Sequence, residues 1–98
     1  MNVINRQAVR QMMDDHAEVS AALDAWWRVT RAARWKHLEE CRQSLRTADQ
    51  VGRCLIFDLL GNHYRLITVV SWRNQRICVK ALLTHRQYER NAWHKWAY

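Results

Sequence analysis

The stretch Leu55-Ile56-Phe57-Asp58-Leu59-Leu60-Gly61-Asn62-His63-Tyr64-Arg65-Leu66-Ile67 decides the fold that this sequence predicts. β-Branched and aromatic residues on both sides of Gly61-Asn62 indicate two strands, over residues 53–60 and 63–72. Glycine followed by asparagine is typical of a two-residue hairpin turn, so we expect the two strands to pair antiparallel. With this turn as the loop, Asp58 lies opposite Arg65.

A third strand, over residues 76–83, follows the weaker turn signal Asn74-Gln75. A two-residue loop at this turn places Thr84 opposite Arg65 and Lys80 opposite Val69. Arg65 is therefore expected to point away from the core, between two polar neighbours. Alternation of side chains along the three strands assigns one apolar face to the sheet, and its members are Leu55, Phe57, Leu59, Tyr64, Leu66, Val70, Trp72, Ile77, Val79, Ala81 and Leu83.

Helical periodicity dominates the first half of the chain. Asn5 is a typical N-cap residue, and the apolar residues that follow it recur at helical spacing. Asp15, with Glu18 three residues later, predicts the start of a second helix whose apolar face extends to Ala33. We expect these helices to cover the apolar face of the sheet.

The fold class predicted from these patterns is α+β, in a single domain over residues 1–98. A strand is expected over residues 1–4 and a third helical segment over residues 35–45, with its exit at residues 47–49. The N-terminal strand and the two to three helices then pack on one face of a small, mainly antiparallel twisted sheet, since that face needs burial.

Charge is unevenly distributed along the chain, which carries +7 overall. Residues 1–50 hold eight Lys/Arg against seven Asp/Glu, whereas residues 51–98 hold eight against two. Such a basic second half favours a polyanionic partner such as RNA. The sequence shows neither a signal peptide nor an apolar run long enough to span a bilayer, so a cytoplasmic location is expected.

Metal and cofactor chemistry finds no support in the residue spacing. The three cysteines form no C-x-x-C pair, and the five histidines lack acidic or thiol companions at ligand spacing. The sequence also lacks a glycine-rich phosphate loop and a G-x-S-x-G motif. We therefore expect no cofactor and no metal site, and the cysteines are interpreted as reduced, buried small side chains.

Candidate functional residues gather on the sheet face away from the helices. Arg65 can grip two phosphate oxygens, His85 titrates near neutral pH, and Tyr88 can stack on a base or supply a proton. These three side chains suit RNA cleavage without a metal, which needs a base, an acid and a stabilising cation. Candidates for RNA binding are Lys80, Arg53, Arg86 and Arg73.

Structural interpretations of the same residues remain open. Arg65 and Asp58 can form a simple cross-strand ion pair, and His85 can merely end a strand. Tyr88, Trp93 and Trp96 can pack a short C-terminal helix against the domain, which is the favoured interpretation for the two tryptophans.

The sequence resembles the HigB toxins of type II toxin–antitoxin modules. The segments that carry the resemblance are Ala48 to Gly52, the stretch Leu55 to Ile67 quoted above, and Leu83-Thr84-His85-Arg86-Gln87-Tyr88-Glu89. The combination G-N-x-Y-R-L-I followed by T-H-x-x-Y is its most specific part, and the aromatic helix ending in Trp35-Lys36 is also similar.

The resemblance implies a RelE-like fold and cleavage of translated mRNA on the ribosome. It also implies a small helix-turn-helix, HigA-like antitoxin as partner, with operator DNA bound only through the antitoxin complex. The strand arginine of the family pattern corresponds to Arg65, and its C-terminal histidine and tyrosine correspond to His85 and Tyr88. The competing hypothesis is a non-catalytic basic module that binds RNA or the ribosome through phosphate contacts alone.

Three positions depart from the pattern of many HigB relatives. Asparagine is common in place of Asp58, a second glycine in place of Leu60, and aspartate in place of Glu89. The first departure matters most, since a carboxylate beside Arg65 either neutralises the phosphate clamp or orients it.

Overall fold

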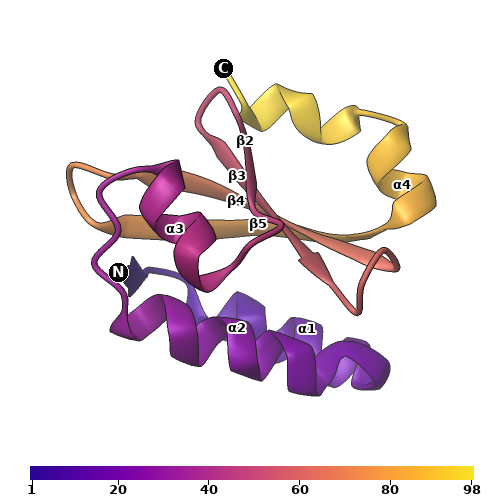
Figure 1. Ribbon diagram of the computed structural model, residues 1–98. Coiled ribbons are helices and arrows are strands. Elements are labelled where there is room, and N and C mark those ends of the chain that lie inside the picture. The colour runs from indigo at the N-terminus through magenta and orange to yellow at the C-terminus, as the bar shows by residue number, and fades with distance from the viewer.

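A five-stranded, mostly antiparallel sheet in the order β1-β5-β4-β3-β2 forms the centre of the computed structural model, which describes all 98 residues (Figure 1). Only the pair β1–β5 is parallel. None of the helices combines the length and the apolar composition that a membrane crossing requires. In chain order the elements are β1 (Asn2–Val3), α1 (Arg6–Asp15), the 3-10 helix η1 (Ala17–Val19), α2 (Ser20–Ala32), α3 (Leu38–Ser44), β2 (Asp49–Val51), β3 (Cys54–Leu59), β4 (Tyr64–Ser71), β5 (Arg76–Thr84), α4 (His85–Glu89) and the 3-10 helix η2 (Ala92–Trp96).

Helices α1, α2 and α3 cover one face of the sheet, as the amphipathic pattern predicts (Figure 1). Trp26 of α2 is 2% exposed and meets Phe57 of β3 edge to face, with 5.4 Å between ring centroids. Leu23 of α2 and Cys41 of α3 are fully buried in the same cluster. Burial raises the pKa of the Cys41 thiol to about 12, so this cysteine stays protonated at neutral pH.

The β3–β4 hairpin confirms the predicted register, in which Asp58 pairs with Arg65. Its turn, however, spans residues 60–63, and both Leu60 (φ 51°) and Gly61 (φ 62°) adopt the left-handed conformation. That conformation costs a residue with a Cβ atom about 1–2 kcal/mol. Glycine has no Cβ atom and avoids this cost, so a glycine at position 60, next to Gly61, would suit the turn better than Leu60 does.

The second hairpin corrects the expected register of β5 in two ways. Its turn has four residues, 72–75, so Val69 pairs with Cys78 instead of Lys80. A β-bulge then leaves Lys80 unpaired, because Ile67 pairs with Ala81 while Thr68 pairs with Val79.

One extra residue in a strand exchanges the two faces beyond it. Leu83, not Thr84, therefore lies opposite Arg65, and Thr84 pairs with Tyr64. Ala81 and Leu83 pack on the face away from α1 and α2, whereas Leu82 turns toward the helices. The prediction that Ala81 and Leu83 line the helix-covered face is wrong for this reason.

The side chain of Asn5 ends the regular backbone pairing between β5 and the N-terminal segment. Asn5 occupies the N-cap position of α1 but makes no capping bond there. Its side chain instead donates to the Val79 carbonyl oxygen (2.6 Å) and accepts from the Val79 N–H (2.8 Å), one residue before the bulge at Lys80. An asparagine side chain thus replaces a strand partner beyond the two residues of β1.

Other expected boundaries in the first half also differ. Asp15 ends α1 instead of capping the next helix, and α2 begins at Ser20 after the turn η1. The third helix covers only residues 38–44, and the expected exit at 47–49 leads directly into β2. Since β2 has only three residues, its alternation is too short to identify a strand from sequence.

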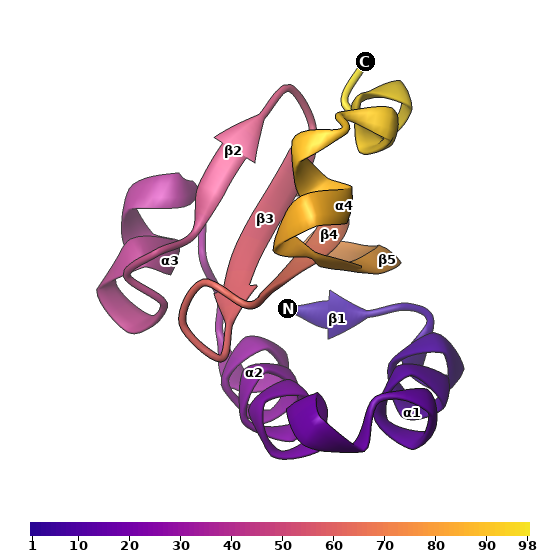
Figure 2. The same ribbon diagram turned by 90° about the vertical axis from the view of Figure 1, so that its right-hand side faces the viewer.

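The second face of the sheet is covered by the C-terminal segment that contains α4 and η2 (Figure 2). Trp93 (3% exposed) and Ala97 (2% exposed) pack there on Cys54, Ile56 and Ile67. The favoured interpretation of the C-terminal tryptophans as packing residues is therefore correct.

Gly52 and Gly61 provide a test of how the C-terminal segment docks. Both have positive φ, but a Cβ atom on Gly52 meets the Ala97 carbonyl oxygen at 2.2 Å, whereas one on Gly61 meets nothing within 4 Å. We predict that Gly61→Ala lowers the free energy of unfolding by about 1–2 kcal/mol, the cost of left-handed backbone. Gly52→Ala should cost clearly more, because it also displaces residues 97–98. Urea unfolding followed by tryptophan fluorescence measures both, and equal losses would contradict the proposed docking.

Candidate functional site

Arg65 is the centre of the candidate site and is held by one ion pair and two hydrogen bonds. Its Nε lies 3.1 Å from Asp58 Oδ1, its Nη1 donates to the Tyr64 carbonyl oxygen at 3.2 Å, and its Nη2 donates to Asn62 Oδ1. The β3–β4 register places Asp58 opposite Arg65, and the turn between the two strands carries Asn62. Arg65 points away from α1 and α2 as predicted, but it is 8% exposed and not solvent-facing.

Tyr88 of α4 covers the guanidinium of Arg65. The guanidinium carbon lies 5.3 Å from the centre of the phenol ring, within the range of a cation–π contact. Behind Tyr88, the ring of Trp93 stacks at 5.1 Å and 7°. The Trp93 indole N–H also donates to the Tyr88 carbonyl oxygen at 3.0 Å, so the tryptophan fixes both the ring and the backbone of Tyr88.

The Tyr88 phenol is kept protonated by its surroundings. Burial raises its pKa most, the charge of Asp49 raises it further, and the cation of Arg65 opposes these effects. Because an isolated phenol already has a pKa near 10, this side chain carries its proton throughout the neutral range. Tyr88 can therefore donate a hydrogen bond or a proton, and it is not a base at neutral pH.

His85 begins α4, and the Thr84–Gln87 capping box fixes where that helix starts. The His85 backbone N–H donates to the His63 carbonyl oxygen at 3.1 Å, which ties the helix to the β3–β4 turn. Tyr88 stands three positions after His85, so both share one side of α4. Arg65 of β4 and Leu83 of β5 are paired, which puts the start of α4 at the Arg65 end of the sheet.

The imidazole of His85 is paired with a carboxylate. Its Nε2 lies 2.8 Å from Glu89 Oε1, one helical turn later, while its Nδ1 is enclosed without a hydrogen-bond partner. A bound substrate therefore cannot reach Nδ1, and Nε2 is the nitrogen that lies beside the carboxylate.

The four expected RNA-binding cations are all exposed, but they do not surround Arg65. Arg86 lies on α4 beside His85, and Lys80 projects from the bulge of β5. Arg53 precedes β3 and donates from Nε to the Trp96 carbonyl oxygen at 2.9 Å, whereas Arg73 lies in the turn beyond the far end of β4. Only Arg86 shares the end of the sheet at which Arg65 lies.

Three residues of the site were not identified from sequence. Asn62 binds Arg65, Glu89 binds His85, and Trp93 supports Tyr88. The spacing of four between His85 and Glu89 on a predicted helix is a signal that could have found the pair. Asn62 and Trp93 gave no comparable signal, because their contacts depend on the turn geometry and on the C-terminal segment folding back.

The structure offers no cluster of three or more His, Cys, Asp or Glu side chains suited to a metal ion. An α+β sheet with helices on one face and a cationic, tyrosine-covered site on the other defines the class as RelE-like. A family model described as HigB_toxin, RelE-like toxic component of a toxin-antitoxin system, matches residues 19–91.

The chain belongs to the HigB toxin family, since this match covers well over half of its length. It is therefore the toxin of a toxin–antitoxin system, and an antitoxin is its partner. Among curated proteins, none matches the chain significantly.

The raised pKa of Tyr88 predicts a loss of stability at alkaline pH. The unfolded chain releases this proton near pH 10, whereas the folded state retains it to higher pH. The contribution is fully present below about pH 10 and is lost as pH rises through the folded-state pKa. Tyr88→Phe removes it, so the free energy of unfolding should fall less steeply as pH rises above about pH 10 in the variant than in the parent. Urea titrations at several pH values measure the two slopes, and equal slopes would exclude burial of the phenol.

Proposed function

We propose that this toxin is a metal-independent endoribonuclease that cleaves translated mRNA on the ribosome and is neutralised by a HigA-like helix-turn-helix antitoxin. The observation that carries the proposal is the contact between Arg65 and Tyr88, with His85 on the same side of α4, in a chain of a RelE-like toxin family. The proposal treats residues 1–98 as one toxin domain.

Arg65 is proposed to stabilise negative charge on the scissile phosphate. A guanidinium has five N–H donors, and two hydrogen bonds to protein groups occupy one N–H on each Nη, while Nε faces the Asp58 carboxylate. Each Nη therefore keeps one N–H, and two such donors match the spacing of two phosphate oxygens. The contacts to Asp58 and Asn62 hold the group in position before substrate arrives, which is how electrostatic catalysis avoids reorganisation.

His85 and Tyr88 are proposed to move the two protons of the reaction. His85 accepts the proton of the 2′-hydroxyl through Nε2, because Nδ1 is enclosed, and the 2′-oxygen then attacks phosphorus. The bond to the 5′-oxygen then breaks, and that oxygen takes a proton from Tyr88, leaving a 2′,3′-cyclic phosphate and a 5′-hydroxyl. The raised pKa of Tyr88 supports its role as the acid. No step requires a metal ion.

The exposed cations Arg86, Lys80, Arg53 and Arg73 are proposed as RNA contacts at increasing distance from the reacting phosphate. They lie from α4 along the sheet to the β4–β5 turn, so they suit binding of a chain longer than one nucleotide. Their contribution is to affinity and its salt dependence, not to the chemical step.

Variants at the three central residues test the proposal. Arg65→Ala should reduce cleavage about a hundredfold to a thousandfold by removing transition-state stabilisation. His85→Gln should reduce it by roughly a hundredfold to ten-thousandfold, because glutamine keeps hydrogen bonding but cannot titrate. Tyr88→Phe should reduce it in the same way while keeping the cation–π contact. The measurement is the rate at which mRNA is cut on purified translating ribosomes.

Binding and folding controls distinguish a loss of catalysis from a loss of folding. Arg65→Ala leaves Asp58 without its cation and should cost about 1–3 kcal/mol of stability, so its melting curve is recorded alongside. Ribosome binding should change little in all three variants, and Arg90→Gln, outside the site, serves as the control. A parent protein that binds ribosomes but cuts no RNA would favour the non-catalytic binding module.

Asp58→Asn tests whether the carboxylate weakens the clamp. Asparagine keeps an oxygen in the place of Asp58 Oδ1, but the site loses one negative charge near the phosphate. We predict that this variant cleaves as fast as the parent or faster, by roughly threefold to tenfold, as removal of one opposing charge allows. A tenfold slower variant with unchanged stability would instead assign the carboxylate a positive role in catalysis.

A further inference from the structure

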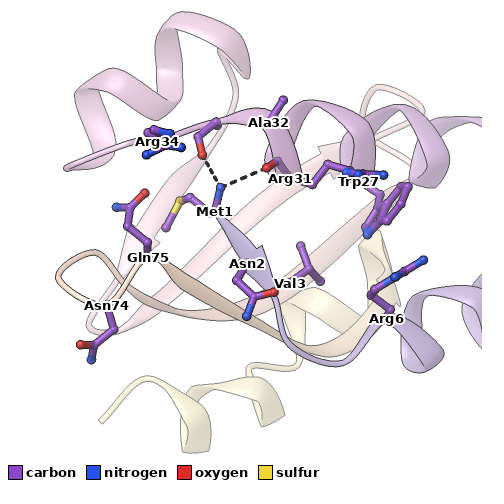
Figure 3. A pocket seen from close by; sticks show the side chains of 11 residues that line it. Met1, Asn2, Val3, Arg6, Trp27, Arg31, Ala32, Arg34, Asn74 and Gln75 are labelled. Carbon is purple, nitrogen blue, oxygen red and sulfur yellow. Dashed lines mark hydrogen bonds between the residues drawn. The ribbon is translucent and has the colours of Figure 1, made fainter.

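A second cationic site lies away from Arg65, between β1 and the C-terminal end of α2. It is an open pocket of about 720 Å³, and Asn74 and Gln75 of the β4–β5 turn form its far wall (Figure 3). Its floor is held by the Met1 amino group, which donates to the carbonyl oxygens of Thr30 and Ala33 at the end of α2. These hydrogen bonds fix β1 against the end of α2, so the pocket lies between two segments that are bonded to each other.

Three arginines line this pocket, which we call the β1–α2 pocket, and no carboxylate does. The guanidiniums of Arg6 and Arg31 both contact the ring of Trp27, at 5.1 and 4.6 Å from its centre. Arg34 completes the set, and none of the three forms an ion pair. Asp24, in the adjoining hollow, is already bound to Arg28 at 2.9 Å.

Because basic and acidic residues are nearly equal in number over residues 1–50, the sequence contains no signal for this cationic pocket. The seven acidic residues balance the eight basic ones in number, but none of those acids faces the pocket. Further cations extend the same surface on both sides: Arg10 shares a hollow with Arg6, and Lys36 and Arg73 share one with Arg34. Unpaired guanidiniums in a row attract an extended anionic chain.

Apolar side chains beside the arginines favour a protein over a nucleic acid. Ile4 is 54% exposed in the hollow that contains Arg6 and Arg10, and Trp27 is half-buried in the pocket itself. Both flanking guanidiniums occupy the Trp27 ring, so it is not free to stack on a base. An exposed isoleucine makes no favourable contact with a phosphate group. A peptide that carries acidic and apolar residues can contact both the arginines and the isoleucine.

We propose that the β1–α2 pocket binds an acidic segment of the antitoxin. The partner follows from membership of a toxin–antitoxin family, and the acidic character follows from three unpaired arginines without a facing carboxylate. The inference does not depend on RNA cleavage, because it concerns a surface on the other side of the sheet from Arg65.

Charge reversal tests this docking surface. Arg31 and Arg34 are exposed, so Arg31→Glu/Arg34→Glu should leave the fold intact, as circular dichroism and melting curves can verify. Affinity for the purified antitoxin encoded beside the toxin should fall by about a hundredfold, because like charges then meet at the interface. The control Arg46→Glu/Arg90→Glu makes the same change in net charge at two exposed positions elsewhere and should bind within about twofold of the parent.

Labelling of the unmodified protein gives an independent measurement. In the complex with antitoxin, Arg31 and Arg34 should be protected from phenylglyoxal, while Arg46 and Arg90 remain reactive. Unchanged affinity of the Arg31→Glu/Arg34→Glu variant, equal losses in both variants, or full reactivity of Arg31 and Arg34 in the complex would each overturn the proposal. Loss of ribosome binding with intact antitoxin binding would reassign the pocket to RNA. Absence of RNA cleavage would overturn only the proposed enzymatic function, since both measurements here are of binding.

Discussion

The bulge at Lys80 is the constraint on which the arrangement of both faces of the sheet depends. Before it, Ile77 and Val79 pack under the helices, and after it Ala81 and Leu83 pack under the C-terminal segment. A regular β5 would direct all four to the same face, as plain alternation predicts. The bulge allows one strand to serve two cores, and Asn5 stabilises the backbone of Val79 immediately before it.

A consequence of the second core is that Arg65 is buried and must be paired with charge and hydrogen-bond acceptors. A desolvated guanidinium is stable only when charge and hydrogen bonds replace water. Asp58 supplies the charge, Asn62 and the Tyr64 carbonyl supply acceptors, and Tyr88 supplies a π face. The same contacts that make the arginine stable also fix its orientation. Structural and functional interpretations of the Arg65–Asp58 pair therefore do not exclude each other.

The proposed surfaces divide the molecule by layer. The proposed RNA site belongs to β4 and α4, on the face covered by the C-terminal segment (Figure 2). The β1–α2 pocket belongs to the helix layer and the sheet edge. Trp93 and Trp27 make similar contacts in the two proposed sites, since Trp93 stacks on Tyr88 and Trp27 contacts the guanidinium of Arg6. A toxin needs both a substrate and a restraining partner, and separate surfaces let each evolve its own charge pattern.

The sequence by itself determined the α+β class, the β3–β4 register and the face that carries Arg65. These features depend on residues close in the chain: alternation along each strand, a glycine turn between them, and helical spacing in the first half. Residues 85–88 were likewise identified from a short motif, which α4 then presents as one helical turn.

Only the tertiary structure decided the rest. The bulge, the burial of Arg65 under Tyr88, and the gathering of Arg6, Arg31 and Arg34 around Trp27 all join segments far apart in the chain. Local propensity contains no information about such contacts, because one inserted residue or one docked segment changes which side chains meet while leaving every short-range pattern unchanged.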